Sequence, residues 1–544
     1  MRKKKTRIII TRILEAIVLL SGITLLLLQS PGVQTKLTQE AIGLAEKHID
    51  AKIEFSRIKF APFTTLIIKD LAIIDKNPQS SLDTLFCAQH ISATFTLKGL
   101  LAKKGGVHLD RLRAEGVCLN MAISDTTRCE YENNFSSVFM IKEKVDEHKE
   151  IPDLFSIRRA DIKNFRFRML NLNEGPYEYP GEGINWFDMD LTADVRGHDI
   201  NFVDSHCSFY VDRGIISEKS GYSLSIKGEC VTGMGLTDVR NTQIRDAHSS
   251  VYLNRFTMYA EKNSDFKDFV HKVILSLDAT AEPLAVETVS HFCGLFSDSP
   301  LLLDIEKLKF QGSIDDPEIS QAVFRERLSG VDADLSLKMK NALDPQSSEL
   351  KLLSKKLKLS PEGIGSFVSA FMEDKKLDLS SFAPGMEADL TGSVEGPLNE
   401  LQADLKLKSN MGDILLQAKL SELVSPDQAP SFEGELAVKG ADLAKIGISE
   451  SLGRTSLNLK AGGTLHKGNP YIKIDKLNVD ELTFNDYTYS KIDGTGYFED
   501  KTFTGNLRCN DPNLTLIFGG SFSLSNKSSN SIYRFNLNLA YADL

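Results

Sequence analysis

The chain has 544 residues, which at roughly 100 to 200 residues per domain is enough for three or four domains or for one elongated repetitive body. Hydrophobic residues make up 42% and charged residues 25%, proportions that exclude a disordered chain, a collagen and a protein that spans the bilayer many times. The net charge is −10, and because five basic residues precede Ile8, the rest of the chain carries about −15. This acidic balance argues against a nucleic-acid partner held by phosphate contacts.

The first predicted element is a membrane-spanning helix at residues 8–28, which gives about 31 Å of helix at 1.5 Å per residue. Arg12 and Glu15 interrupt it, but they lie three apart on one helical face near the cytoplasmic end, where they can pair. A cleaved signal peptide is the alternative, since the uninterrupted apolar stretch covers only residues 16–28. No small-residue cleavage pattern follows Leu28, however, so we expect an uncleaved signal-anchor. Its apolar residues are Ile8, Ile9, Ile10, Ile13, Leu14, Ile17, Val18, Leu19, Leu20, Ile23, Leu25, Leu26, Leu27 and Leu28.

The basic cluster at residues 1–7 lies before this span, and no comparable cluster follows it closely. The positive-inside rule therefore predicts a cytoplasmic N-terminus, a single pass through the inner membrane and an exported body. Export favours disulfides, yet the seven cysteines are an odd number with no shared spacing and no C-x-x-C pair. We expect them to be mostly small buried hydrophobes in strands.

After a short amphipathic helix predicted at residues 35–49, apolar and polar residues alternate from Lys52 nearly to the C-terminus, with Gly at many strand ends. Strands with one apolar and one polar face are typical of antiparallel meanders, whereas parallel sheets covered by helices show continuous apolar runs. The sequence therefore predicts a mainly β fold with few helices, of which two lie at residues 283–296 and 360–373. A polar, charged loop at residues 125–152 separates an N-terminal α+β region at 29–124 from a repetitive β-strand region at 153–544. The strand pattern runs on to Leu544, as expected of a piece of something longer.

The alternation is clearest in the second half of the chain, where its apolar positions are candidates for the lining of a groove. These are Leu335, Leu337, Met339, Leu405, Leu407, Leu436, Val438, Leu457, Leu459, Leu537 and Leu539. With few amphipathic helices to cover this face, either the sheet closes on itself as an ordinary sandwich core or another molecule covers it. Acyl chains suit such a face, because about 25 cal/mol per Å² of apolar surface removed from water stabilises a lipid without any specific contact.

Motifs that carry enzyme chemistry are absent from the sequence, including G-x-x-x-x-G-K-[ST], G-x-S-x-G, H-E-x-x-H and a G-x-G-x-x-G after a strand. The neighbours His206 and Cys207 point to opposite faces of a strand, and His291 and Cys293 are two apart on a helix. Asp315 and Asp316 stand beside a proline and are typical of a turn. We therefore expect no enzyme activity, no catalytic or metal residue and no cofactor, although an exported enzyme with an unrecognised site stays an alternative.

Several short motifs follow the predicted span in order: Leu28-Gln29-Ser30-Pro31-Gly32-Val33-Gln34, Lys52-Ile53-Glu54-Phe55, Leu66-Ile67-Ile68-Lys69-Asp70-Leu71 with Asp75, Asp83-Thr84-Leu85, Ile91-Ser92-Ala93, and His108-Leu109-Asp110-Arg111-Leu112 with Glu115-Gly116 and the strand at 117–121. Residues 432–443 form a further strand unit of the same kind. Taken together, these motifs resemble the N-terminal part of the TamB family (translocation and assembly module, inner-membrane subunit) within the AsmA-like superfamily, in its Bacteroidetes form. The likeness covers most of the chain, and its distinctive part is residues 8–121.

This resemblance implies an inner-membrane-anchored periplasmic protein whose elongated, curled antiparallel β-sheet forms a trough with an apolar interior, a β-taco. It also implies phospholipid transfer between the inner and outer membranes in support of outer-membrane biogenesis. The alternative is a scaffold for the assembly of outer-membrane β-barrel proteins and for protein secretion, beside an Omp85-family partner. The chain lacks the C-terminal module of full TamB proteins, through which such a partner is expected to bind.

Overall fold

The computed structural model describes residues 36, 50–61, 64–78, 82–96, 107–123, 133–138, 155–173, 183–203, 206–233, 235–293, 299–369, 382–425, 428–448, 450–465, 470–499, 502–523 and 532–543. Strands dominate these residues, and the helices are few and short. The chain divides into two compact units. Unit 1 comprises Met1–His248 and Thr288–Ser297, and unit 2 comprises Ser249–Glu287 and Asp298–Leu544.

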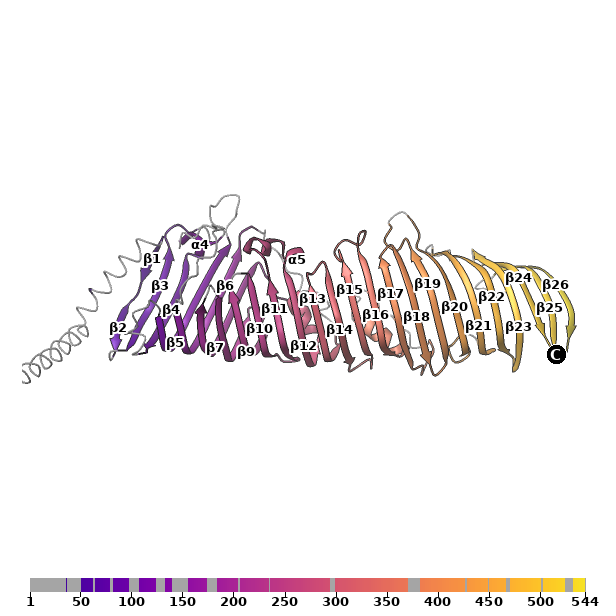
Figure 1. Cartoon of the computed structure of the whole chain (residues 1–544), viewed down its shortest axis with the longest axis horizontal. Helices are drawn as coiled ribbons and strands as arrows, with labels where there is room; N and C mark the ends of the chain where they lie inside the picture. Colours follow the sequence, from indigo (N-terminus) through magenta and orange to yellow (C-terminus); the bar gives the residue numbers. More distant parts are fainter. Residues whose placement is uncertain are drawn as a thin grey trace, which may run out of the picture. The chain divides into compact units, whose positions relative to one another are not determined.

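Unit 1 is an open sheet whose strands follow one another in chain order (Figure 1). Its strands are β1 (Ala51–Glu54), β2 (Arg57–Ala61), β3 (Thr65–Asp75), β4 (Thr84–Phe95), β5 (Val107–Ile123), β6 (Phe155–Asn171), β7 (Asp188–Val203), β8 (His206–Glu218), β9 (Ser223–Gly233) and β10 (Leu236–Arg245), and a short helix α4 (Asn134–Val138) lies between β5 and β6. Both β1 and β2 pair with β3, so together they form one interrupted strand.

The pairing of β5 with β6 is parallel, and it departs from the purely antiparallel sheet that the sequence predicts. A parallel pair needs a connection of a dozen residues or more to bring the chain back to the same end of the sheet. The polar stretch at 125–152, expected to separate two blocks of strands, lies in this connection, and the strands on both sides of it belong to unit 1. The other described pairings of unit 1 are antiparallel.

One face of unit 1 carries its apolar core. Ala88, Ala114 and Val117 are buried there, and Ile162 and Phe165 of β6 pack against them. A second cluster lies around α4. Ala114 and Val117 are three residues apart in β5, as are Ile162 and Phe165 in β6, so strict alternation would place them on opposite faces. Gly116 and Asn164, with φ of 62° and 51°, interrupt the alternation and bring these residues to one face of the sheet.

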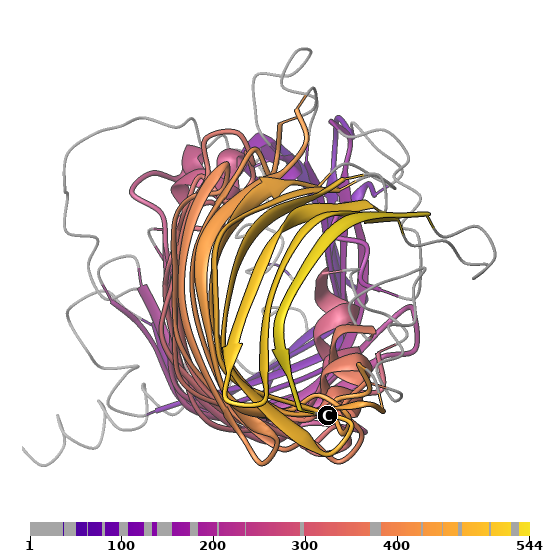
Figure 2. The same ribbon diagram turned by 90° about the vertical axis from the view of Figure 1, so that its right-hand side faces the viewer.

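Unit 2 is an antiparallel sheet in which each strand pairs with the next one along the chain. Its strands are β11 (Ser250–Tyr259), β12 (Ile274–Ala285), β13 (Leu302–Gly312), β14 (Pro317–Glu326), β15 (Asp332–Lys340), β16 (Glu349–Leu359), β17 (Ala388–Pro397), β18 (Glu400–Ser409), β19 (Gly412–Ser421), β20 (Ser431–Asp442), β21 (Leu452–Thr464), β22 (Tyr471–Phe484), β23 (Tyr487–Glu499), β24 (Thr502–Asp511), β25 (Leu514–Ser523) and β26 (Ile532–Ala542). Figure 2 shows its later strands, in orange to yellow, curving along their length, so this sheet is curled and open as expected.

Turn chemistry sets the ends of these hairpins. Asn485 and Asp486 join β22 to β23 and both have positive φ, of 46° and 67°. Two successive left-handed residues are typical of a type I′ turn, whose twist matches that of the strands it joins. Buried carboxylates brace other turns: Glu326 is 0% exposed, its Oε1 accepts a hydrogen bond from the Leu302 amide at 3.1 Å, and its Oε2 accepts one from the Ser329 amide.

This bracing also sets the ionisation of Glu326. Burial alone would raise the pKa of the carboxyl, but its hydrogen bonds with Ser329, Leu328 and Leu302 outweigh that effect and hold the pKa below its usual range. The carboxylate form is therefore the form that the fold stabilises.

Helices are few, as expected, and the two inside the strand region are α6 (Val286–Cys293) and α7 (Pro361–Ser369). They lie where helices are predicted at 283–296 and 360–373, but residues 283–285 complete strand β12 instead of starting a helix. A 3₁₀ helix, η1 (Asn263–Asp268), and α5 (Phe269–Lys272) join β11 to β12 and are not predicted from the sequence.

The predicted anchor at 8–28, the basic segment at 1–7 and nearly all of the predicted helix at 35–49 lie outside the described residues. In the part of the chain that the structure does describe, none of the helices has the length and apolar character needed to cross a membrane.

Candidate functional site: the apolar face of unit 2

The hairpin of β18 and β19 shows how the sequence builds the two faces of unit 2. Successive side chains of a strand point to opposite faces, so Leu405 and Leu407 share one face while the intervening lysines share the other. In β19, Leu416 lies directly opposite Leu405, and its neighbour Leu415 points to the other face. Leu415 is 48% exposed, whereas Leu416 is half-buried. Because the two side chains are identical, the difference in exposure comes from their surroundings, and the face of Leu416 is the less exposed of the two.

Strand register extends this face across the sheet as continuous rows. The first row is Leu335, Ser354, Gly392, Leu405, Leu416, Leu436, Leu459, Leu477, Gly494, Leu507, Phe518 and Leu537. The second row is Leu390, Leu407, Ile414, Val438, Leu457, Val479, Ile492, Cys509, Leu516 and Leu539. The third row is Leu337, Leu352, Val394, Ala403, Ala418, Gly434, Ala461, Ile474, Gly496, Gly505, Gly520 and Phe535. We call these three rows the apolar face.

No residue of the apolar face carries a charge. Its hydroxyl, on Ser354, donates to the carbonyl oxygen of Leu390 at 3.0 Å, so the hydrogen-bonding capacity of that donor is met inside the protein. Gly392 stands opposite Leu405 with φ of 134°, and a Cβ there would lie 2.0 Å from the carbonyl oxygen of Asp404. Only glycine fits this position without strain.

Coverage of the apolar face by protein is small in the described part of unit 2. Helix α7 packs on its margin through Phe367, whose ring centroid lies 6.5 Å from that of Phe324. Phe324 shares this face because it pairs with Ala333, two residues before Leu335 in β15. No second sheet covers the rows among the described residues, and most of their side chains are half-buried, from the buried Val479 and Cys509 to Leu537 and Leu539, which are about half exposed.

The opposite face is polar and carries cross-strand ion pairs. Lys460 pairs with Glu435 at 3.1 Å, Lys338 pairs with Glu318 at 2.7 Å, and Lys419 pairs with Glu400. A hollow of about 340 Å³ on this face has Glu435 and Lys460 in its lining. Most of its lining comes from polar-face residues, although Leu436 and Leu459 of the first row also border it.

All eleven candidate groove residues lie on the same side of the sheet. Ten of them belong to the three rows, and Met339 follows Leu337 two residues further along β15, opposite Leu350. Sequence reasoning missed the positions between them, which are Leu352, Leu390, Val394, Ile414, Leu416, Ile474, Leu477, Val479, Ile492, Leu507, Leu516 and Phe518. The same two-residue alternation runs through these strands, and it is the signal by which these positions could have been found.

The histidine and aspartates considered in the sequence as possible catalytic or metal residues make contacts of a structural kind. His291 stacks on Tyr222 with ring centroids 4.0 Å apart, inside unit 1. Asp315 and Asp316 accept hydrogen bonds from the amides of Leu343 and Asn341 at 3.0 and 2.9 Å, as turn carboxylates do. Within the described residues, no group of three or more His, Cys, Asp or Glu side chains is placed to hold a metal ion.

The cysteines differ from expectation in one respect. Cys87 and Cys118 lie opposite each other in β4 and β5 and form a disulfide, with Cα atoms 4.9 Å apart. Neighbouring strands bring the two cysteines together, and their spacing in the sequence does not reveal this. Cys207, Cys230 and Cys509 are free thiols, and burial raises the pKa of Cys230 to about 11. Cys509 is buried in a strand, as expected, and is part of the apolar face, whereas Cys207 and Cys230 are only half-buried.

Neither a family model, nor a curated protein, nor a solved structure matches this chain. A function for this chain therefore has to be inferred from the geometry of the apolar face itself.

Proposed function

We propose that this protein carries phospholipids along the apolar face of unit 2, between the inner and outer membranes of a bacterium. In this proposal residues 8–28 anchor the chain in the inner membrane, and the strand units occupy the periplasm. The ligand is the acyl portion of the lipid, since an uncharged face with no polar recognition groups favours hydrocarbon over any particular headgroup. The protein then acts as a conduit and not as an enzyme.

The observation that supports this proposal is the unbroken length of the rows. From β15 to β26 the first row spans about 50 Å at roughly 4.8 Å per strand. One acyl chain spans about 15 Å, half of the ~30 Å hydrocarbon core of a bilayer. The three rows are about 14 Å wide, because residues two apart in a strand are separated by roughly 6.8 Å. A face that is long enough for several acyl chains end to end suits passage of lipids better than tight binding of a single molecule.

Export is supported by the disulfide between Cys87 and Cys118. Disulfides persist in oxidising compartments such as the periplasm and are rare in the cytosol. This agrees with the orientation that the basic cluster at 1–7 and the apolar segment at 8–28 predict.

Site-specific photocrosslinking tests the proposal. A photoreactive amino acid at Leu459, on the apolar face, is expected to form a phospholipid adduct in living cells, whereas the same residue at Asn458, its neighbour on the polar face, is expected to form none. Native mass spectrometry of the detergent-extracted full chain is expected to show retained phospholipid. Absence of lipid from both measurements, or equal labelling at the two sites, would refute the conduit.

A further inference from the structure

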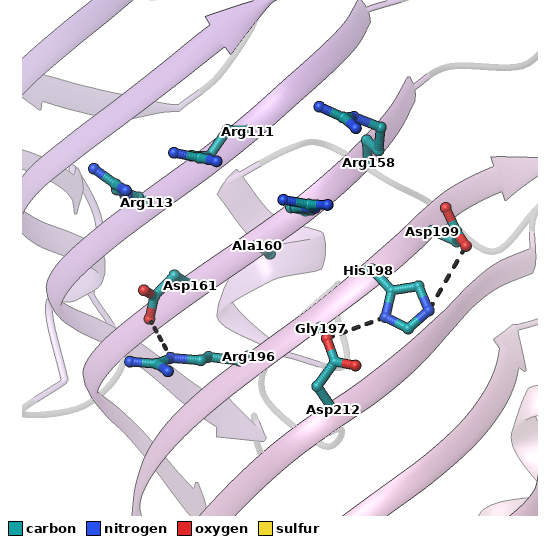
Figure 3. A pocket seen from close by; sticks show the side chains of 11 residues that line it. Arg111, Arg113, Arg158, Ala160, Asp161, Arg196, Gly197, His198, Asp199 and Asp212 are labelled. Carbon is teal, nitrogen blue, oxygen red and sulfur yellow. Dashed lines mark hydrogen bonds and ion pairs between the residues drawn. The ribbon is translucent and has the colours of Figure 1, made fainter.

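A second feature, in unit 1, is a hollow of about 740 Å³ on the sheet formed by β5, β6, β7 and β8 (Figure 3). Arginine side chains from three neighbouring strands dominate its lining, among them Arg111, Arg113, Arg159 and Arg196. This concentration of positive charge contrasts with the net charge of the chain, which is −10.

Strand register explains how these side chains meet. The parallel pairing of β5 and β6 puts Arg113 beside Asp161, and the same offset puts Arg111 beside Arg159. Across the next pairing Arg159 lies opposite His198. All of these residues point away from the buried face that contains Ala114.

Some charges of this hollow are compensated inside the protein. Arg196 pairs with Asp161 at 3.5 Å, and Nδ1 of His198 lies 3.0 Å from Asp212 (Figure 3). Arg158, at the rim, pairs with Asp110 through Nε at 2.7 Å.

Arg111, Arg113 and Arg159 are different. Among the described residues none of the three has a carboxylate partner within ion-pair distance. Like charges side by side on adjacent strands destabilise a sheet. Asp161 lies beside Arg113 but already pairs with Arg196. Five arginines line the hollow with only three carboxylates, those of Asp161, Asp199 and Asp212, so the lining keeps an excess of positive charge that suits a bound anion.

We propose that Arg111, Arg113 and Arg159 form a binding site for a phosphate ester. The planar guanidinium fork binds phosphate oxygens in a bidentate manner, and several forks from adjacent strands surround one phosphate group. The volume falls within the range of small-ligand pockets, roughly 300 to 1,000 Å³, and leaves space for the group that the phosphate carries. An anionic phospholipid headgroup and a soluble phosphorylated molecule share this chemistry. A nucleic acid would need basic surface well beyond this hollow, which an acidic chain does not offer.

This site stands independently of the proposed lipid conduit, because it lies in unit 1 on the polar side of the sheet. Its test uses the full chain in a maltoside detergent, which contains no phosphate, and isothermal titration with inorganic phosphate at low salt. The variant Arg111→Gln/Arg113→Gln/Arg159→Gln is expected to bind phosphate at least about tenfold more weakly than the wild type. The matched control Lys406→Gln/Lys408→Gln/Lys439→Gln removes three positive charges from the polar face of unit 2 and is expected to bind like the wild type.

The conservative variant Arg111→Lys/Arg113→Lys/Arg159→Lys keeps the charge and removes the bidentate forks. It is expected to melt like the wild type and to bind phosphate several-fold more weakly, so it carries the comparison if the glutamine variant is unstable. Two competition experiments identify the source of the phosphate. If the ligand is a lipid headgroup, phosphatidylglycerol added to the micelles displaces inorganic phosphate. If the ligand is a soluble molecule, glycerol 3-phosphate displaces it and phosphatidylglycerol does not. A wild type that binds no phosphate, or arginine variants that bind it unchanged, would overturn the proposal.

Discussion

Replacement of Leu457 by Asp separates an open lipid-binding face from a closed protein core. Leu457 lies in the second row of the apolar face, between Val438 and Val479 on the neighbouring strands, and it is half-buried. Full burial of a leucine contributes about 1.5 to 3 kcal/mol, so loss of this half-buried side chain costs roughly 1 to 1.5 kcal/mol. On an open face water reaches the new carboxylate, and the cost stays near that value. In a closed core the unpaired charge would cost more than about 4 kcal/mol.

These two costs differ enough to be distinguished by thermal melting of the full chain in detergent. At roughly 2 to 4 °C per kcal/mol for a large domain, the open face predicts a decrease in Tm of about 2 to 6 °C. A closed core predicts a decrease of more than about 8 °C, or an unfolded protein. The control is Asn458→Asp, which adds the same charge to the exposed polar face of the same strand. We expect Leu457→Asp to fold but to abolish the lipid adduct at Leu459. We expect Asn458→Asp to keep both the wild-type Tm and the adduct. An unfolded Leu457→Asp would refute the open-face reasoning and favour an ordinary sandwich core.

Three further predictions concern stability and processing. Because its folded pKa is lowered, Glu326 stabilises the fold above the unfolded value of about 4.3, and this contribution is lost as pH falls through the folded pKa. Glu326→Gln should therefore lower Tm at pH 7, by a cost of about 1 to 3 kcal/mol, and the difference from the wild type should shrink in melts at successively lower pH. Cys118→Ala opens a disulfide between residues 31 apart and should cost about 2 to 4 kcal/mol, and a reductant should lower the wild-type Tm to that of the variant but leave the variant unchanged. N-terminal sequencing of membrane-extracted protein should find a start before Gln29, and a start beyond it would contradict an uncleaved anchor.

Much of the architecture was predictable because a strand has a side-chain period of two. Leu457 and Leu459 alternate with polar residues, and this alone places them on one face wherever the strand pairs. The rows also contain positions that carry no hydropathy signal. Gly392 and Gly494 stand in the first row because register aligns them with leucines of the next strand, and register is a property of the pairing rather than of either strand alone.

Features that depend on pairing across long sequence separations were not predictable. The parallel pairing of β5 with β6 is an example, since alternation looks the same in a strand whichever direction its neighbour runs. The arginine hollow depends on this pairing, because it is what brings Arg159 beside Arg111. The disulfide of Cys87 with Cys118 likewise requires that β4 and β5 pair in one register.

The neighbour-to-neighbour pairing of unit 2 has a consequence for how the protein is made. From β11 to β26 each pairing joins strands that are adjacent in the chain, so most contacts close short loops and the entropy lost at each closure is small. A sheet of this kind lengthens one hairpin at a time, and each new strand pairs with a strand that is already folded. Its stability is the sum of local terms, as in a repeat protein, so damage to one strand frays the sheet on either side and spares distant strands. β5 and β6 are the contrast, since β6 pairs with β5 only after a long connection, and closing this loop costs more entropy than closing a hairpin.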